Sequence, residues 1–410
     1  MNGTDRDNRF TTGWHMILLT VLVFVFSLLC IGMAGGKILD WANTEDEHET
    51  ISQEKTTPVL SSTDAVEHEQ KNTGAKEKTS GSAEFIQRAE LFINHLDRLW
   101  DRSIYLKAEL SRIDSVLTYL TTGEIASSQV ICGMNGWMFY KSPNDGNSMA
   151  DFEGTNRYPE EELNDMLRTT LATQRKAEEN GIQVAILVPP NKENVYSEYM
   201  PKQYNHALVS STDILIDRFR DAGVRICSPK AELIDFRNDS QVYYFCDSHW
   251  NQLGGYIGVR TALKEWGIEI PALSERSIVS CPLKNCYHDA AVDDLARMTG
   301  LLSFFDNEKE YIVEGTQLPD WQEYEAEQNL GNLSVYLNRE AMTDNTVMLI
   351  GDSFRTAMIP ALCEAFSKVC VIHRSAFKSE MLNDVQPDYL LMEYVERYSD
   401  EIGNIDFLFQ

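Results

Sequence analysis

Two short polar clusters in this 410-residue chain contain the residue types of a serine-dependent acyl-transfer site. The first is Ile350-Gly-Asp-Ser-Phe354, and the second is Cys246-Asp-Ser-His-Trp-Asn251. A serine hydroxyl is a poor nucleophile at neutral pH and needs a base within hydrogen-bond reach. An imidazole titrates near neutrality, and a carboxylate two residues earlier can hold its other nitrogen. We therefore predict Ser353 as nucleophile, His249 as general base and Asp247 as the residue that orients the base.

Each cluster also has a plainer interpretation. Gly-Asp-Ser is a common tripeptide, and Ser353 could simply cap the helix that follows it. The Asp-Ser-His turn could likewise cap a helix or form half of a metal site, although the neighbouring sequence offers no further ligands. His249 stands out because, of the eight histidines, it alone has both a carboxylate two residues earlier and a predicted strand end before it.

Buried strands and helices alternate around these clusters. Strands are predicted over 182–188, 224–227, 346–350, 369–373 and 388–393, and helices over 159–181, 215–223, 252–266 and 356–368, with a short helix before the last strand. Strands that alternate with helices indicate βαβ units and a parallel sheet covered on both faces. The predicted fold class is therefore α/β, with three layers around a central, mostly parallel sheet. In such sheets ligands bind beyond the carboxyl ends of the strands, where both polar clusters fall.

The composition of the chain excludes some classes of function. The formal net charge is −27, and no run of Lys and Arg occurs. Because binding to phosphates requires clustered basic side chains, a general nucleic-acid binder is excluded. Hydrophobic residues make up 43% of the chain, which is enough for a substantial core.

A long apolar segment lies near the N-terminus. Residues 14–36 carry few polar side chains, and about 20 apolar residues are what a helix needs to cross a bilayer. We predict a transmembrane signal anchor there, with a cleaved signal peptide as the alternative. Arg6 and Arg9 precede the segment, which favours a cytoplasmic tail over residues 1–13. The protein is thus expected in the cell membrane as a single-pass protein with its large C-terminal part extracytoplasmic.

Three regions follow the apolar segment. Residues 37–83 have almost no large apolar side chains and are predicted to be a disordered linker. Over residues 84–130 the apolar residues return at helical spacing, which predicts an amphipathic helical segment that leads into the domain. Packing of this helix on its own domain is the expected arrangement, and a coiled coil or partner helix is the alternative. Residues 131–410 are predicted to form the catalytic domain.

The chain contains eight cysteines, of which Cys30 lies in the apolar segment. Cys281 and Cys286 are predicted to form a local disulfide if the compartment is oxidising. With His288 they could instead bind zinc, but a single Cys-x4-Cys without a second pair is a weak metal signal. The other cysteines are expected to pack as small hydrophobic residues.

Together the two polar clusters resemble the SGNH hydrolase superfamily, and more closely its alginate O-acetyltransferase (AlgJ/AlgX-like) family. In that family an Asp-x-His-Trp segment precedes the Gly-Asp-Ser block, and this chain has the same order. Further segments match the family pattern in order, namely Gly133-Met-Asn-Gly-Trp-Met-Phe-Tyr140, Val188-Pro-Pro-Asn-Lys192 with Tyr196 and Tyr199-Met-Pro201, Asp294-Leu-Ala-Arg-Met298, and the block from Pro387-Asp388 to Glu396-Arg397. The resemblance spans roughly residues 133–397 and implies an SGNH-hydrolase-like fold.

The resemblance also implies roles for individual residues. Ser353 would take an acetyl group, His249 would remove and return the proton, and Asp247 would orient His249. Lys192, Tyr196 and the Ser353 backbone N–H are candidates for substrate or oxyanion contacts. The alternatives are a solvated loop charge for Lys192 and a packing residue for Tyr196. Neither a metal nor a cofactor is expected.

The function implied by the resemblance is O-acetylation of an exopolysaccharide or cell-wall polymer outside the membrane. Because a surface enzyme has no soluble acetyl-coenzyme A, the expected acetyl donor is a multi-pass membrane acyltransferase (MBOAT-like). Arg374, at a predicted strand end, is a candidate contact for an anionic sugar, with an ordinary surface residue as the alternative. The competing functions are a carbohydrate acetylesterase, a non-catalytic polysaccharide-binding assembly subunit, and transfer of another acyl group such as D-alanine.

Overall fold

The computed structural model of the chain describes residues 104–122, 125, 127–141, 143–283, 293–301, 308–316, 321–323 and 333–409. Among these residues, no helix combines the length and the apolar character needed to cross a membrane. The predicted apolar span over 14–36 and the predicted linker over 37–83 lie outside the described residues, as do Cys286 and His288.

The centre of the fold is a seven-stranded sheet with the strand order β4-β3-β11-β9-β10-β8-β7. Its parallel part comprises β4 (Ile226–Cys227), β3 (Gln183–Leu187), β11 (Tyr389–Glu393), β9 (Thr343–Gly351) and β10 (Phe366–His373). Two antiparallel pairings then add β8 (Ser334–Leu337) and β7 (Trp321–Glu323) at the β10 side. The prediction of a central, mostly parallel sheet is confirmed.

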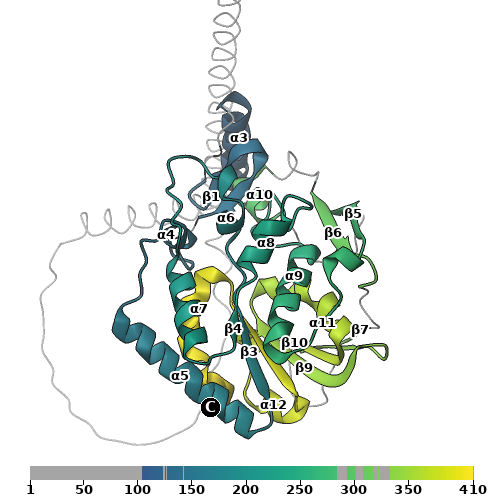
Figure 1. Cartoon of the computed structure of the whole chain (residues 1–410). Coiled ribbons are helices and arrows are strands. Elements are labelled where there is room, and N and C mark those ends of the chain that lie inside the picture. Colours follow the sequence, from purple (N-terminus) through teal and green to yellow (C-terminus); the bar gives the residue numbers. More distant parts are fainter. Residues whose placement is uncertain are drawn as a thin grey trace, which may run out of the picture. The chain divides into compact units, whose positions relative to one another are not determined.

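Helices cover both faces of this sheet, which gives three layers (Figure 1). Along β3, Ala185 and Leu187 face one core cluster while Val184 and Ile186 face the other, as the two-residue period of a strand requires. The first cluster is closed by α9 (Gln252–Leu263) and α11 (Ile359–Ala365). The second is closed by α5 (Glu160–Glu179), α7 (Ser211–Asp221), α12 (Glu380–Val385) and the 3-10 segment η9 (Glu396–Phe409).

The predicted elements of this core are present, and several boundaries differ from the prediction. The strand predicted over 346–350 begins at Thr343 as β9, and the strand predicted over 224–227 begins at Ile226 as β4. The predicted helix over 356–368 is in fact a 3-10 turn, η7 (Ser353–Met358), followed by the short helix α11, which ends at Ala365. The strand β10 begins at Phe366, three residues earlier than predicted, because Phe366 and Lys368 already pair with β9. Tertiary pairing with a neighbouring strand overrides local helical spacing at this point.

Smaller elements surround the three layers. Two two-stranded antiparallel sheets are formed by β1 (Val130–Cys132) with β2 (Met138–Tyr140) and by β5 (Ile278–Pro282) with β6 (Lys309–Val313). The helix α3 (Ile104–Thr122) packs Val116 and Tyr119 against a third apolar cluster that also contains Leu295 of α10 (Asp294–Thr299). The expected packing of this helix on its own domain is thus observed for its C-terminal part.

The cysteines of the described region divide into two kinds. Cys281 takes part in a disulfide. Cys227, Cys246, Cys363 and Cys370 are buried free thiols, and Cys132 is a half-buried free thiol. The four buried thiols pack as small hydrophobic residues, as expected.

Candidate active site

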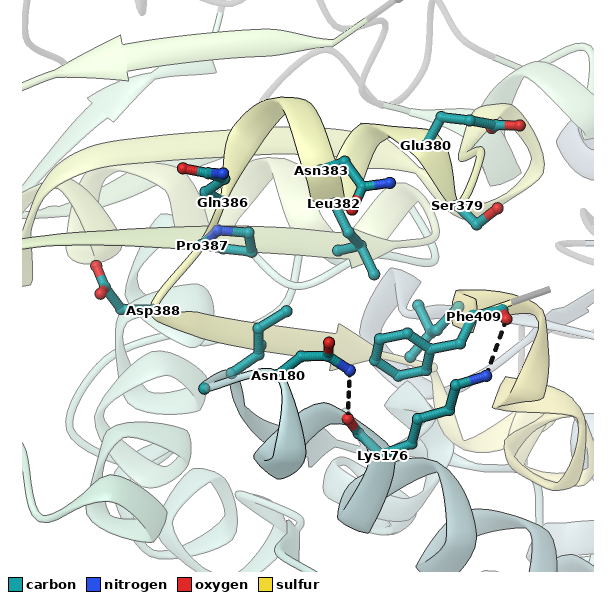
Figure 2. A pocket seen from close by; sticks show the side chains of 13 residues that line it. Lys176, Asn180, Ser379, Glu380, Leu382, Asn383, Gln386, Pro387, Asp388 and Phe409 are labelled. Carbon is teal, nitrogen blue, oxygen red and sulfur yellow. Dashed lines mark hydrogen bonds between the residues drawn. The ribbon is translucent and has the colours of Figure 1, made fainter.

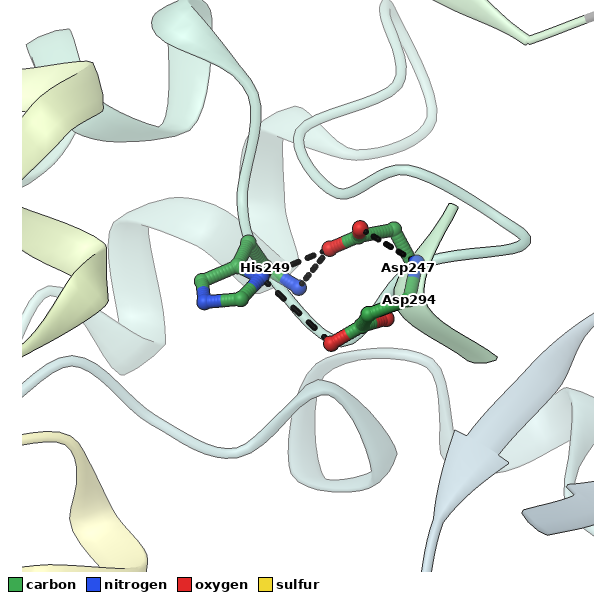
Figure 3. A group of neighbouring side chains, drawn as sticks. All are labelled: Asp247, His249 and Asp294. Atoms are coloured by element: carbon green, nitrogen blue, oxygen red, sulfur yellow. Dashed lines mark hydrogen bonds and ion pairs between the residues drawn. The ribbon is translucent and has the colours of Figure 1, made fainter. Parts of the chain in front are cut away.

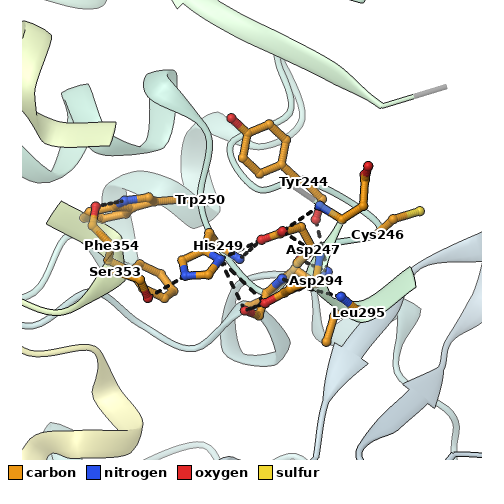
Figure 4. A network of polar contacts seen from close by, with 12 residues as sticks. Tyr244, Cys246, Asp247, His249, Trp250, Asp294, Leu295, Ser353 and Phe354 are labelled. Atoms are coloured by element: carbon orange, nitrogen blue, oxygen red, sulfur yellow. Dashed lines mark hydrogen bonds and ion pairs between the residues drawn. The ribbon is translucent and has the colours of Figure 1, made fainter. Parts of the chain in front are cut away.

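Ser353, His249 and Asp247 form a continuous hydrogen-bonded chain at the carboxyl edge of the parallel sheet (Figure 4). The distance from His249 Nε2 to Ser353 Oγ is 2.6 Å, and the distance from His249 Nδ1 to Asp247 Oδ1 is 2.7 Å. Ser353 is exposed, whereas Asp247 is buried. This order of groups allows the imidazole to take the hydroxyl proton at one nitrogen while the carboxylate fixes the other.

In both clusters a neighbouring residue caps the helix, so neither Ser353 nor His249 has this role. The side chain of Asp352 accepts the Phe354 N–H at 2.9 Å and caps η7. The side chain of Asn251 accepts the Gly254 N–H at 3.0 Å and caps α9. Asp352 and Asn251 thus accept the N–H groups at the two helix starts. The Ser353 hydroxyl and the His249 ring contact each other instead.

The turn that carries Ser353 rests on buried acidic groups. Glu393, at the end of β11, accepts the Asp352 N–H at 2.9 Å, and Asp352 accepts the Val395 N–H at 3.0 Å. A side chain at Gly351 would approach the Glu393 carboxylate to 2.4 Å, so only glycine fits between strand and acid. Burial, followed by the neighbouring charge of Asp352, raises the pKa of Glu393 well above its ordinary value. The two backbone N–H groups that these carboxylates accept tie the nucleophile turn to the end of β11.

Asp247 is held in its ionised form by backbone N–H groups. Its Oδ2 accepts the N–H groups of Asp293 and Asp294 at the start of α10, at 2.7 and 2.9 Å. Its Oδ1 accepts the backbone N–H of His249 at 2.8 Å as well as the ring nitrogen. Burial alone would raise the pKa of Asp247, but the charge and hydrogen bonds of His249, with the α10 N–H groups, lower it to about 2. The Asp247 carboxylate is therefore ionised at every pH at which neutral His249 can accept the serine proton.

We expect the activity to fall on acidification at a higher pH than for an ordinary histidine. Burial would lower the pKa of His249, but the charges of Asp247 and Asp294 outweigh burial and raise it above 6.5. Only the neutral imidazole can accept the serine proton, so the active fraction decreases as the pH falls through this raised value. Initial rates of p-nitrophenyl acetate cleavage across the pH range should show the acid limb of kcat/KM above pH 6.5. An acid limb below pH 6.5 would contradict the raised pKa of His249.

Trp250 fixes the base-bearing loop to the nucleophile turn. Its buried indole N–H donates to the Phe354 carbonyl at 2.9 Å. A side chain at Gly258 would approach the indole to 2.6 Å, and one at Gly255 would approach the Ala357 carbonyl to 2.3 Å. The glycines of α9 thus allow Trp250 and η7 to pack closely on the helix, and this packing sets the distance between His249 and Ser353.

Lys192 and Tyr196, predicted as substrate or oxyanion contacts, lie inside the protein instead. Lys192 is 2% exposed, and its Nζ donates to the carbonyls of Tyr244, Phe245 and Asp247 at 2.7–3.2 Å. Tyr196 is 3% exposed, and its hydroxyl accepts the Val242 N–H at 3.0 Å. Both side chains are used to hold the loop that precedes His249, so they do not face a substrate.

We expect Lys192→Met to destabilise the fold by about 2–4 kcal/mol, because three buried carbonyls lose their donor. Burial lowers the pKa of Lys192 to about 8, and Glu308, Asp247 and Asp294 limit that decrease. Methionine keeps the length of the side chain and removes only the ammonium group. Urea unfolding of both proteins measures the difference. Lys202→Met, at an exposed lysine, is the matched control, and equal midpoints for the two variants would contradict this role.

Arg374 lies at the same edge of the sheet as Ser353 but is already engaged. It directly follows β10, whose last residue, His373, pairs with Gly351. Its guanidinium forms an ion pair with Glu401 and lies 4.5 Å from the ring centroid of Tyr398. The structure therefore does not present Arg374 as a free cation for an anionic sugar.

Arg397 packs against the ring of Phe354, the residue that follows Ser353. Its guanidinium lies 5.6 Å from the Phe354 ring centroid, 5.5 Å from that of Tyr140 and 5.0 Å from that of Tyr398. The hydroxyls of Tyr140 and Tyr398 both donate to Asp145, at 2.8 and 2.5 Å. Arg397, Asp145 and these aromatic rings thus form one cluster that reaches Phe354, the residue after Ser353, and that the sequence analysis did not predict.

Asp247, His249 and Asp294 are close enough together to raise the question of a metal site (Figure 3). Their candidate ligand atoms lie within 4.8 Å of one another. Both oxygens of Asp247 already accept backbone N–H groups, and the oxygens of Asp294 accept from Ser248. Donors pointing at these carboxylates occupy the lone pairs that a cation would need. The geometry therefore favours acid–base chemistry over metal ligation.

A cavity of about 650 Å³ lies at the opposite edge of the sheet (Figure 2). Ile182 and Asp388, which directly precede β3 and β11, contribute to its lining. Lys176 extends along it and donates to the Phe409 carbonyl at 3.1 Å. Because the triad lies beyond the carboxyl ends of the strands, this cavity is separate from the candidate active site.

Some residues that support the site were missed in the sequence. Glu308 accepts the N–H groups of Phe245 and Cys246 at 2.8 and 2.9 Å and thereby fixes the loop just before Asp247. Asp294 was noted only as part of a family-like segment, yet it lies beside His249. Glu308 and Asp294 come from separate parts of the chain, and no local pattern ties either of them to the triad.

Comparison with known proteins gives one family match. The model of the family described as "SGNH hydrolase-like domain, acetyltransferase AlgX" matches residues 130–358, which is more than half of the chain. No functionally curated protein matches the sequence. The match covers both the base-bearing loop and Ser353.

Several solved structures are similar at low sequence identity. Bacillus cereus PatB1 is 13% identical with a TM-score of 0.45, and the match covers 67% of this chain and 96% of that one. The O-acetyltransferase domain of Pseudomonas putida AlgJ is 14% identical with a TM-score of 0.42, covering 67% and 99%. Pseudomonas aeruginosa AlgX is 12% identical with a TM-score of 0.40, covering 67% and 66%.

The three-layer fold and the family match define an SGNH-like domain of the acyltransferase and esterase class. Within that class, the chain belongs to the AlgX-type acetyltransferase family.

Proposed function

We propose that the protein is an extracytoplasmic O-acetyltransferase that moves acetyl groups through a Ser353 acyl-enzyme onto hydroxyls of a polysaccharide. The observation that carries this proposal is the assembled chain of Ser353, His249 and Asp247, with contacts of 2.6 and 2.7 Å, in a member of the AlgX-type family. A positioned base within this distance activates a serine hydroxyl without a cofactor.

The reaction takes place in two half-reactions. The Ser353 hydroxyl gives its proton to His249 Nε2 and forms a bond to the acetyl carbonyl carbon, and the donor leaves with the proton returned by His249. A sugar hydroxyl then gives its proton to His249 and attacks the acetyl carbon, and Ser353 leaves as the restored hydroxyl. The N–H of Ser353, the first residue of η7, precedes the first intrahelical hydrogen bond and is our candidate donor for the oxyanion.

The proposal includes a location and an acetyl donor. The apolar segment over 14–36 would anchor the chain, and the domain would work outside the membrane on an exopolysaccharide or cell-wall polymer. A multi-pass membrane acyltransferase of the MBOAT type would supply the acetyl group. Sequence resemblance to the alginate O-acetyltransferases supports this part. AlgX and an O-acetyltransferase domain of AlgJ are among the structures similar to this chain.

Hydrolysis is the main competing activity. Ser353 is exposed, so water and a sugar hydroxyl can both reach an acyl group on its Oγ. The same residues would then make a carbohydrate acetylesterase, because only the acceptor of the second half-reaction differs.

Mass spectrometry of the intact purified protein after a p-nitrophenyl acetate pulse separates these activities. We expect the mass of one acetyl group to appear on Ser353 and to disappear faster when an acceptor oligosaccharide is added. Loss at the same rate with and without sugar would establish the esterase. A protein that never carries acetyl and shows no turnover would favour a non-catalytic assembly subunit.

A further inference from the structure

The imidazole of His249 faces two carboxylates instead of one. Its Nδ1 lies 2.7 Å from Asp247 Oδ1 and 3.7 Å from Asp294 Oδ2 (Figures 3 and 4). Asp247 directly precedes the His249 turn, whereas Asp294 is the first residue of α10. A triad needs a single orienting carboxylate, so the second one requires an explanation.

Ser248 connects the second carboxylate to the ring. Its hydroxyl donates to Asp294 Oδ2 at 2.5 Å and lies 3.4 Å from His249 Nδ1, while its backbone N–H donates to Asp294 Oδ1 at 2.7 Å. Asp294 in turn donates its own N–H to Asp247 Oδ2 at 2.9 Å. The two carboxylates, the serine and the imidazole therefore form one closed network, and moving Asp294 would move all three partners.

We infer that Asp294 is a positioning residue of the reaction, a second carboxylate that acts through Ser248 and through its charge to hold the imidazole and stabilise its protonated form. This inference rests on the proposed acyl-enzyme chemistry, in which His249 becomes positively charged in both half-reactions. Asp247 supplies the direct hydrogen bond. In its ionised form Asp294 supplies a second negative charge on the same side of the ring, where the positive charge develops. Burial, followed by the charge of Asp247, raises the pKa of Asp294, so this contribution requires a pH above that raised value.

The charged groups around His249 are consistent with these separate roles of Asp247 and Asp294. Asp247 and Asp294 favour the protonated imidazole, whereas Arg397, on the Phe354 side of the ring, opposes it. Lys192 contacts the Asp247 carbonyl from behind the loop. Asp293, adjacent to Asp294, is a neighbouring charge for Asp247 but not one of the main influences on His249. Asp294 is thus the second anion that acts on the base.

The variant that tests the inference is Asp294→Asn, which keeps the size of the side chain and removes its charge. Selective ¹⁵N-histidine NMR of the full chain, in the Ser353→Ala background, reports the pKa of His249 without relying on turnover. We expect that pKa to be lower in Asp294→Asn by about one unit and, in the Ser353-containing enzyme, kcat to fall about tenfold with little change in KM. The acid limb of the pH profile should move to lower pH, because a less basic imidazole stays neutral to a lower pH.

Asp293→Asn is the matched control, since it removes the same charge one residue away. We expect it to change the pKa of His249 less than Asp294→Asn does, and equal changes would overturn the inference. An unchanged pKa and kcat in a folded Asp294→Asn protein would also overturn it. If Asp294→Asn does not fold, Asp294→Glu keeps the charge but moves the carboxylate. That variant should retain the raised pKa with a lower kcat, and an unchanged kcat would overturn the inference.

The proposed function and the role of Asp294 are tested by different measurements, namely turnover in Ser353→Ala and the titration of His249. Persistent acetyl turnover in Ser353→Ala would refute the acyl-enzyme chemistry, whatever the NMR titration shows. Loss of turnover in Ser353→Ala together with an unmoved His249 titration in Asp294→Asn would leave the function standing and remove the role of Asp294.

Discussion

Ser353→Ala is expected to reduce acetyl turnover by at least about 10⁴-fold, while the protein remains folded. The substitution removes the oxygen that lies 2.6 Å from His249 Nε2, and with it the covalent route. Because Ser353 is exposed and Asp352 caps the following turn, the fold does not depend on the hydroxyl. Steady-state release of p-nitrophenol and acetyl capture by mass spectrometry measure the loss.

Thr356→Ala is the control for this first prediction. Thr356 is an exposed hydroxyl residue in the same 3-10 turn, η7, as Ser353. Its removal should leave the rate within about twofold, since exposed substitutions away from the chemistry have small effects. A similar loss in both variants would show that the turn, rather than the Ser353 oxygen, is responsible.

Asp247→Asn is expected to lower kcat by about 10³–10⁴-fold, because an amide cannot stabilise the imidazolium or select the correct tautomer. The carboxylate accepts the His249 ring on one oxygen and two N–H groups of α10 on the other. An amide has only one acceptor, so one of these sets loses its partner. The rate should fall although the Asp247→Asn variant still carries Ser353.

The same substitution should alter stability in acid. The pKa of folded Asp247 is about 2, below its ordinary value of 3.8, so its ionised form stabilises the fold above about pH 4. That contribution disappears as the pH falls from about 4 to 2 in the wild type, and Asp247→Asn should lack this part of the acid dependence. Urea midpoints measured between these pH values test it. Asp239→Asn, at an exposed carboxylate, should keep the full dependence, and identical acid profiles for Asp247→Asn and the wild type would refute it.

The parallel core of the fold could be predicted because its signals are local. The apolar run over 182–188 and the helix that follows Pro159 are each encoded within one segment, and the structure confirms both as β3 and α5. The antiparallel strands β8 and β7 were not predicted, because they depend on pairing at the sheet edge rather than on strong apolar periodicity. The early start of β10 likewise depends on pairing with a neighbouring strand, β9.

The site was predictable to the extent that its chemistry is local in sequence. Asp247 and His249 are two residues apart, and Ser353 sits in a recognisable turn, so all three could be named before their distances were known. The environment of Lys192 could not be foreseen, since three carbonyls of a distant loop decide whether that ammonium faces inward. The positions of Asp294 and Arg397 next to the triad likewise depend on long-range packing.

The indole of Trp250 has a consequence for how this sequence can vary. It ties the base loop to the nucleophile turn across 104 residues of chain, inside a space that Gly258 leaves open. A change to any one of these three parts alters the fit of the other two, so their substitutions should be strongly epistatic. Substitutions at exposed positions away from these three parts should be tolerated singly, whereas the Trp250 contact should change only by compensated pairs.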